Sequence, residues 1–212
     1  MFALVSPEKI RLPPGAVVYL PGTWQDYRSL AAQRGDASVP RIKYRSHEIL
    51  LMAPSAEHGR DANLMADVVK VLLDSLEQEY EAFTPITLEL PEQGGIEPDY
   101  CFYIENWPAV AGRTRLQWGI DPPPDLVIEV DVTSYTNVED YLPYQVPEVW
   151  LLKKQQLMIY LLQTNQYGLQ TQSRYFPDMD LQALICRCLK TTYERNSSAA
   201  IRELRQYLTQ RS

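Results

Sequence analysis

The chain has 212 residues, of which 45% are hydrophobic, and a formal net charge of −7. This length allows one sizeable domain, or one domain with a helical appendage. The acidic balance argues against a general nucleic-acid coat, whose surface would have to be basic, but it allows a local basic track beside an acidic centre. Three cysteines without an obvious framework, Cys101, Cys186 and Cys188, indicate a reducing compartment, and no run of residues resembles a membrane span. We therefore expect a cytoplasmic protein without a membrane partner.

The N-terminal part of the chain shows little periodicity. Four prolines fall within residues 1–21, so we expect residues 1–40 to form an arm, with a short helix over Thr23–Gln33. Basic residues then alternate with apolar or aromatic ones in Arg41–Arg45, and an apolar run follows in Ile49–Met52. Together these segments predict a β-hairpin or one bent strand. Its basic face could contact phosphate, although a solvated strand face is the commoner meaning of this pattern.

A long amphipathic helix is predicted next. Ser55 suits an N-cap, and apolar residues recur at helical spacing over Leu64–Leu76, so the helix should continue to about Glu79. Glu57 is favourably placed near the positive end of the helix dipole. His58 lies in the first turn, where a lone histidine is more often a surface or capping residue than a ligand. We keep both as secondary candidates for the functional site.

Further strands and helices alternate along the rest of the chain. Arg113 and Arg115 lie in a loop that precedes the central strand, and Pro143 should shorten or bend the helix after that strand. Thr133 or Ser134 could cap this helix. The expected strands are Phe83–Leu90, Glu97–Ile104, Glu148–Leu152, Gln156–Leu162 and Tyr167–Gln172, and the expected helices are Asn137–Gln145, Leu181–Leu189 and Glu194–Gln210.

The chain is organised around a short apolar strand that follows three prolines. Pro122–Pro124 form a rigid extended lead-in, and the β-branched run Leu126–Val132 is typical of a buried central strand. Because side chains alternate along a strand, Asp125, Glu129 and Asp131 share one face. Carboxylates are costly to bury unless they are paired, protonated or bound to a metal. A twisted edge strand with a solvated face is the alternative; the flanking apolar density favours a carboxylate site.

Four segments of the chain carry a resemblance to a known family. They are Met52–Gly59, Glu97–Asp99, Pro123–Val130 and Val146–Trp150. In this order and spacing they resemble the PD-(D/E)XK nuclease fold, and more closely the widespread bacterial family of putative restriction endonucleases, once called a domain of unknown function. The similarity runs from about Arg41 to Pro177. It implies an α/β (α+β) protein with a restriction-endonuclease-like mixed central sheet flanked by helices.

The resemblance implies a Mg²⁺-dependent endonuclease, with Mn²⁺ as a substitute and DNA as the favoured substrate. In such nucleases an Asp and a Glu on adjacent strands hold the metal together with the backbone carbonyl after the Glu, and here these are Asp99, Glu129 and Val130. The residue chemistry agrees, because hard carboxylate oxygens suit Mg²⁺, which keeps several waters and can present one as a nucleophile. Arg113 or Arg115 would contact the phosphate.

One position departs from the superfamily pattern. A lysine is expected two residues beyond Glu129, and this chain has Asp131 there. In many relatives the lysine lies in the following helix, but residues 137–145 contain none. Asp131 could be a third metal ligand or a base, with Lys153 arriving from a distant strand to balance the phosphate charge. Alternatively the site is decayed, and the chain is a non-catalytic, dimeric nucleic-acid-binding or interaction module. Glycoside hydrolysis by paired carboxylates ranks last, because no aromatic sugar platform is evident.

The ends of the chain suggest an assembly. Residues 41–177 would form the nuclease-like core, and residues 178–212 a helical segment that packs on the core or on a partner subunit. Trp107 and Trp118 in a long loop, and the apolar stripe of Ile201, Leu204 and Leu208 in the tail, are typical of interfaces. Nucleases that cut both strands of a duplex commonly work as pairs, so we expect a two-fold symmetric homodimer.

Overall fold

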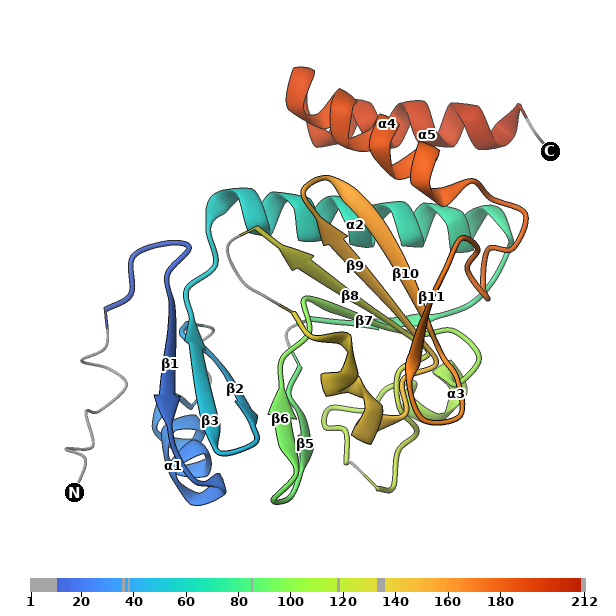
Figure 1. Ribbon diagram of the computed structural model, residues 1–212. Coiled ribbons are helices and arrows are strands. Elements are labelled where there is room, and N and C mark those ends of the chain that lie inside the picture. The colour runs from blue at the N-terminus through green and yellow to red at the C-terminus, as the bar shows by residue number, and fades with distance from the viewer. Residues whose placement is uncertain are drawn as a thin grey trace.

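The strands in the described part of the chain form two β-sheets (Figure 1). The computed structural model describes residues 11–35, 37, 39–84, 86–117, 119–132 and 136–210. In this part of the chain the N-terminal sheet has the strand order β1-β3-β2-β6-β5, and the C-terminal sheet has the order β11-β10-β9-β8-β7-β4. Residues 97–99, which link β6 to β7, carry the chain from the first sheet to the second.

The N-terminal sheet is antiparallel and packs against helix α1 (Trp24–Arg34). A capping box starts this helix: Thr23 Oγ1 accepts from the Asp26 amide, and the Asp26 carboxylate accepts from the Thr23 amide. Tyr27 on α1 packs against Tyr44 in the sheet, with ring centroids 5.7 Å apart. The strands are Val17–Pro21 (β1), Arg41–Arg45 (β2), Glu48–Met52 (β3), Leu88–Leu90 (β5) and Gly94–Ile96 (β6).

In the described part of residues 1–40, which begins at residue 11, strand β1 and helix α1 take the place of the predicted arm. The predicted short helix and the predicted hairpin are both confirmed, as α1 and as the pair of β2 and β3. Strand β1, however, pairs with β3 along its whole length, from Val17 opposite Met52 to Pro21 opposite Glu48. Local periodicity does not reveal β1, because what stabilises this strand is pairing with a segment far along the chain.

The C-terminal sheet is mixed, as the resemblance implies. Strands β8 (Leu126–Asp131) and β9 (Glu148–Lys153) run parallel, and the other neighbours in this sheet are antiparallel. A parallel pair needs a crossover connection, and here it contains the 3₁₀ helix η2 (Val138–Tyr144) with Pro143 inside. Asn137 caps this helix, whereas Thr133 and Ser134 lie outside the described residues. The remaining strands are Glu81–Phe83 (β4), Tyr100–Tyr103 (β7), Gln156–Leu162 (β10) and Tyr167–Gln170 (β11).

Strand β8 is buried at every residue, which excludes the edge-strand alternative. Its two faces belong to different cores. Ile128 and Val130 pack beneath helix α2 (Ala56–Ser75), whereas Val127 packs with Tyr141 of η2 on the other side of the sheet. This is the alternation that the sequence predicts. Ser55 caps α2 as expected, but the helix ends at Ser75 instead of near residue 79.

Helices α4 (Leu181–Glu194) and α5 (Ser197–Thr209) lie on the side of α2 that faces away from the sheet (Figure 1). Leu204 and Leu208 of α5 are buried in the same core as α2, and Ile201 packs against that core. The tail stripe is therefore covered by its own chain, so it does not serve as the expected surface for a second subunit. Trp118, part of the same expectation, lies outside the described residues. Among the described helices, none combines the length and apolar character needed to cross a membrane.

Two predicted elements differ in the structure. The strand expected over Phe83–Leu90 is divided, because β4 belongs to the C-terminal sheet and β5 to the N-terminal sheet. The loop expected over residues 106–121 contains the short helix α3 (Trp107–Val110). Asp125 does not join the carboxylate site: its Oδ2 accepts hydrogen bonds from the backbone amides of residues 104, 105 and 106, so it orders the start of this connection.

Candidate active site

Asp99 and Glu129 are neighbours across adjacent strands. The Asp99 amide donates to the Ile128 carbonyl at 3.2 Å, and the Val130 amide donates to Asp99 Oδ2 at 2.8 Å. Both carboxylates lie on the face of the C-terminal sheet that the alternation predicts. Only 1% of Asp99 and 3% of Glu129 is exposed. Charged groups buried to this extent need partners.

Asp99 has two cationic or hydrogen-bonding partners besides the Val130 amide. Its Oδ1 forms an ion pair with Arg41 of β2 and lies 2.8 Å from His58 Nε2. His58 is held in place by the start of α2, where Ser55 Oγ accepts from the His58 amide at 3.1 Å. Burial alone would raise the pKa of Asp99, but the His58 hydrogen bond and the Arg41 charge outweigh it and lower the pKa. Asp99 is therefore ionised at neutral pH.

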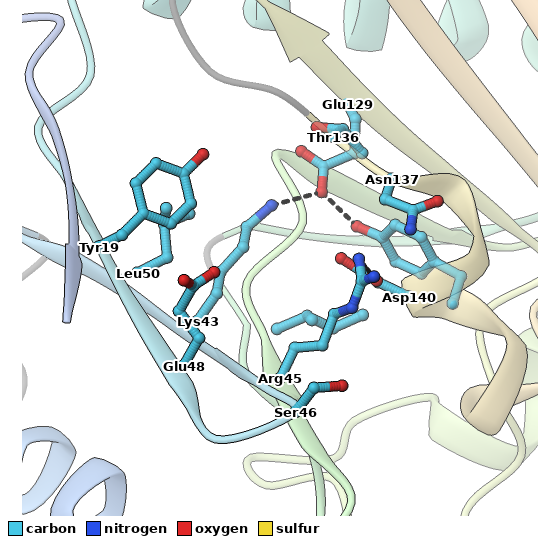
Figure 2. A pocket seen from close by; sticks show the side chains of 12 residues that line it. Tyr19, Lys43, Arg45, Ser46, Glu48, Leu50, Glu129, Thr136, Asn137 and Asp140 are labelled. Atoms are coloured by element: carbon cyan, nitrogen blue, oxygen red, sulfur yellow. Dashed lines mark hydrogen bonds and ion pairs between the residues drawn. The ribbon is translucent and has the colours of Figure 1, made fainter. Parts of the chain in front are cut away.

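Glu129 of the C-terminal sheet forms an ion pair with a lysine of the N-terminal sheet. Lys43 Nζ on β2 donates to Glu129 Oε1 at 2.8 Å, and the Tyr141 hydroxyl donates to the same oxygen (Figure 2). Burial raises the pKa of Glu129, and the Lys43 charge opposes this rise only in part. In Tyr141, burial and the adjacent Glu129 both raise the pKa of the phenol, which therefore stays a donor.

A cavity of about 380 Å³ opens where the two sheets meet at Glu129 (Figure 2). Lys43 and Arg45 line it from β2, and Tyr141 lines it from η2. The opposing charges and the surrounding polar groups suit a polar or charged ligand better than an apolar one. The remaining lining residues are Tyr19, Ser46, Glu48, Leu50, Ile96, Thr136, Asn137 and Asp140.

Asp131 occupies a different environment from Glu129. Its carboxylate accepts from the Thr136 amide at 2.9 Å and from Thr136 Oγ1 at 2.7 Å, and Lys153 Nζ lies 3.8 Å away. It lines a second cavity, of about 230 Å³, together with Glu57 and Asp61 of α2. The structure therefore brings Asp99 and Glu129 together, but it places Asp131 and Glu57 at that second cavity, and Lys153 pairs with Asp131.

Arg113 and Arg115, both within the described part of the chain, are not among the residues that line the cavity at Glu129. The connection that carries them leaves β7 where Phe102 pairs with Leu126, at the start of β8, whereas Glu129 lies near its end. Arg113 instead contacts Asp121, with Nη2 3.5 Å from Oδ1. The sequence could not place this long connection, because its path depends on packing rather than on a local pattern.

The hydrogen bonds to the two carboxylates leave oxygen lone pairs available for a divalent ion. Each carboxylate oxygen has two lone pairs; of the described residues, none donates to Glu129 Oε2, and only the Val130 amide donates to Asp99 Oδ2. No group of three or more His, Cys, Asp or Glu side chains in the described ranges is arranged to hold a metal ion. Two carboxylates with lone pairs still available are a donor set that suits Mg²⁺, which fills its other positions with water or substrate oxygens.

Sequence reasoning missed the partners of these carboxylates. Arg41 and Lys43 were recognised only as a basic strand face, and Tyr141 carries no signal in the sequence. The one available clue was the spacing of Arg41, Lys43 and Arg45, which puts three cations on one face of a strand. His58, a secondary candidate from the sequence, does reach Asp99.

Comparisons with known proteins agree with this fold. The family model Uma2, described as a putative restriction endonuclease, matches residues 24–185. A solved structure of a putative nuclease belonging to DUF820 from Anabaena variabilis ATCC 29413 superposes with a TM-score of 0.54 at 14% identity, covering 89% of this chain and 99% of that chain. This likeness shows a shared fold. No curated protein matches the chain. Because the family model covers more than half of the sequence, the chain belongs to the Uma2 family of putative restriction endonucleases.

Proposed function

We propose that the protein is a divalent-metal-dependent endonuclease that hydrolyses nucleic-acid phosphodiester bonds, with DNA as the favoured substrate. The observation that carries the proposal is the juxtaposition of Asp99 and Glu129 on adjacent strands, together with a cavity that Glu129 and a lysine both line. The description of the family as restriction endonucleases supports the choice of DNA. Mg²⁺ would be the natural ion and Mn²⁺ its substitute.

Each residue of the site has a distinct task in this proposal. Asp99 and Glu129, with the Val130 carbonyl, would hold the ion, which when bound supplies Lewis acidity and a source of activated water. Arg41 and His58 keep Asp99 ionised and fixed in orientation. The overall hydrolysis joins a water oxygen to phosphorus, breaks one P–O ester bond and moves a proton to the leaving alcohol.

A matched pair of acid-to-amide variants tests the function. Glu129→Gln should lower Mn²⁺- or Mg²⁺-dependent cleavage of labelled oligonucleotides by at least about 100-fold, because an amide is a poor ligand for a hard cation. Glu89→Gln is the control, since Glu89 lies on β5 and pairs with the exposed Arg28. Calorimetry should show ion binding in the wild type and in Glu89→Gln but not in Glu129→Gln. Wild-type protein that cleaves neither duplex nor single strands with either ion would contradict the proposal.

A second candidate function is a non-catalytic nucleic-acid-binding or interaction module. One observation favours it: both carboxylates already have protein cations as partners, Arg41 for Asp99 and Lys43 for Glu129. A decayed site would be neutralised in this way. The same experiment separates the two functions, because this module would bind oligonucleotides without cleaving them and would be insensitive to Glu129→Gln.

The proposal includes an assembly and a compartment. Two sites working as a homodimer would allow both strands of a duplex to be cut. The compartment would be the cytoplasm, since all three cysteines, Cys101, Cys186 and Cys188, are free thiols.

A further inference from the structure

The C-terminal sheet lacks a lysine at the position where the superfamily has one. Asp131 stands two residues after Glu129, and it forms an ion pair with Lys153, whose Nζ lies 3.8 Å from Asp131 Oδ2. Both of these described residues are outside the set that lines the cavity at Glu129. A lysine that serves this cavity therefore has to come from another element.

Lys43 comes from the N-terminal sheet and reaches Glu129 from the opposite side of the cavity (Figure 2). Its neighbours Ile42 and Tyr44 point the other way, into the core beneath α1. Because side chains alternate along β2, its three cations lie on the other face of the strand, where they pair with acidic residues that come later in the chain. The three ion pairs are Arg41 with Asp99, Lys43 with Glu129 and Arg45 with Asp140.

Of these three cations, Lys43 is the one suited to act on a substrate. Arg41 pairs with Asp99, which also contacts His58. The side chain of Arg45 is 53% exposed to solvent. Lys43 lines the cavity, is 17% exposed, and uses one donor for Glu129 Oε1. An ammonium has three donors on a flexible stem, so two donors remain for other groups.

We infer that Lys43 takes the place of the missing motif lysine: its ammonium contacts the scissile phosphate in the cavity and orients the attacking water beside Glu129. This inference rests on the proposed nuclease function. In the superfamily pattern the Glu and the lysine lie on the same strand. Here strand β8 would contribute the ligand Glu129, and β2 of the other sheet would contribute the lysine. The active site is then completed only when the two sheets dock.

Four lysine variants test the inference, with single-turnover cleavage of a labelled duplex, Mn²⁺ binding by calorimetry and thermal unfolding as measurements. Lys43→Met should lower the cleavage rate by at least about 100-fold while Mn²⁺ binding is retained or strengthened, because no cation then competes at Glu129. Lys43→Arg keeps an ion pair with Glu129 and thus the fold, but its planar fork cannot replace the ammonium, so the rate should still fall. Lys153→Met tests the rival position. Lys70→Met is the control, since Lys70 pairs with Asp67 on α2, at 3.6 Å.

The outcomes separate this inference from the function on which it rests. Folded Lys43→Met with the wild-type rate would overturn it, and so would a loss of rate in Lys153→Met alone. If Lys43→Met does not fold, Lys43→Arg at the wild-type rate overturns it instead. Wild-type protein without any cleavage would overturn the nuclease function itself. A lowered rate in both Lys43 variants, with Lys70→Met unchanged and Mn²⁺ still bound, supports the assignment.

Discussion

Asp99 is a structural anchor as well as a proposed ligand. Neighbouring carboxylates repel each other, so the removal of one of them would by itself be expected to cost little stability. The structure changes this expectation, because Asp99 is ion-paired with Arg41 and hydrogen-bonded to His58 and to the Val130 amide. Only 15% of the Arg41 side chain is exposed, so loss of the carboxylate would leave a largely buried charge without its partner.

Asp99→Asn should therefore lower the free energy of unfolding by about 3–5 kcal/mol at neutral pH. The pKa of Asp99 is lowered from 3.8 in the folded protein, so its stabilisation is present above that pH and is lost as the pH falls through the folded-state pKa. The difference in the free energy of unfolding between wild type and variant, measured by urea unfolding from about pH 7 to about pH 3, should decrease on acidification. Asp67→Asn, which removes the half-buried partner of Lys70, serves as the control with a cost of at most about 1 kcal/mol. A stability difference that increases at acid pH would contradict the stabilising role of the Asp99 carboxylate.

The two proposed ligands, Asp99 and Glu129, were predictable from the sequence, but their partners were not. Glu129 and Asp99 follow from strand alternation and from two short segments that resemble the family, which are local features. The partners Lys43 and Arg41 come from another sheet, and no local pattern states which acid each cation meets. Asp131 shows the limit of the alternation rule, because it shares a strand face with Glu129 yet lines a different cavity.

Helix α2 connects the site to the main core. Its buried face packs on β8, and its N-cap fixes His58 beside Asp99. The Ser55 cap and the amphipathic helix were predicted from the sequence, since a cap followed by a helical apolar period is a local signal. The contact between His58 and Asp99 was not predicted. The division of residues 83–90 between two sheets was not predicted. Each short strand there has the same alternation, and only tertiary pairing decides which sheet it joins.

The cap of α2 should affect both stability and the site. Ser55→Ala removes the acceptor for the His58 amide and should lower the free energy of unfolding by about 1 kcal/mol. Because the first turn then frays, Mn²⁺ affinity measured by calorimetry should also fall. Asn196→Ala, which removes the cap of α5 by the same chemistry, should cost a similar stability without altering Mn²⁺ affinity. Equal Mn²⁺ affinity in the two variants would show that the cap does not position the site.

At the scale of the whole molecule, the candidate site depends on how the N-terminal sheet is supported. Strand β2, which carries Lys43, lies between β3 and β6, and its Tyr44 packs on Tyr27 of α1. Gly95 of β6 pairs with Tyr44, and Tyr27 is fully buried against both. Helix α1, which falls within the segment predicted to be an arm, is thus part of the support for the cavity.

Gly95→Ala tests this support. A Cβ at Gly95 would lie 2.3 Å from the Tyr27 hydroxyl oxygen and 2.4 Å from its ring carbon Cζ. The buried ring has no room to move, so overpacking should lower the free energy of unfolding by about 1–3 kcal/mol. The shift would also draw β2 and Lys43 away from Glu129, and cleavage should fall with stability. Gly59→Ala on α2 is the control, because nothing lies within 4 Å of the added atom and an alanine stabilises a helix by about 0.5–1 kcal/mol. Urea unfolding and Mn²⁺-dependent cleavage measure both effects: wild-type stability in Gly95→Ala would contradict the packing, and lowered stability with full cleavage would show that Lys43 is placed independently of it.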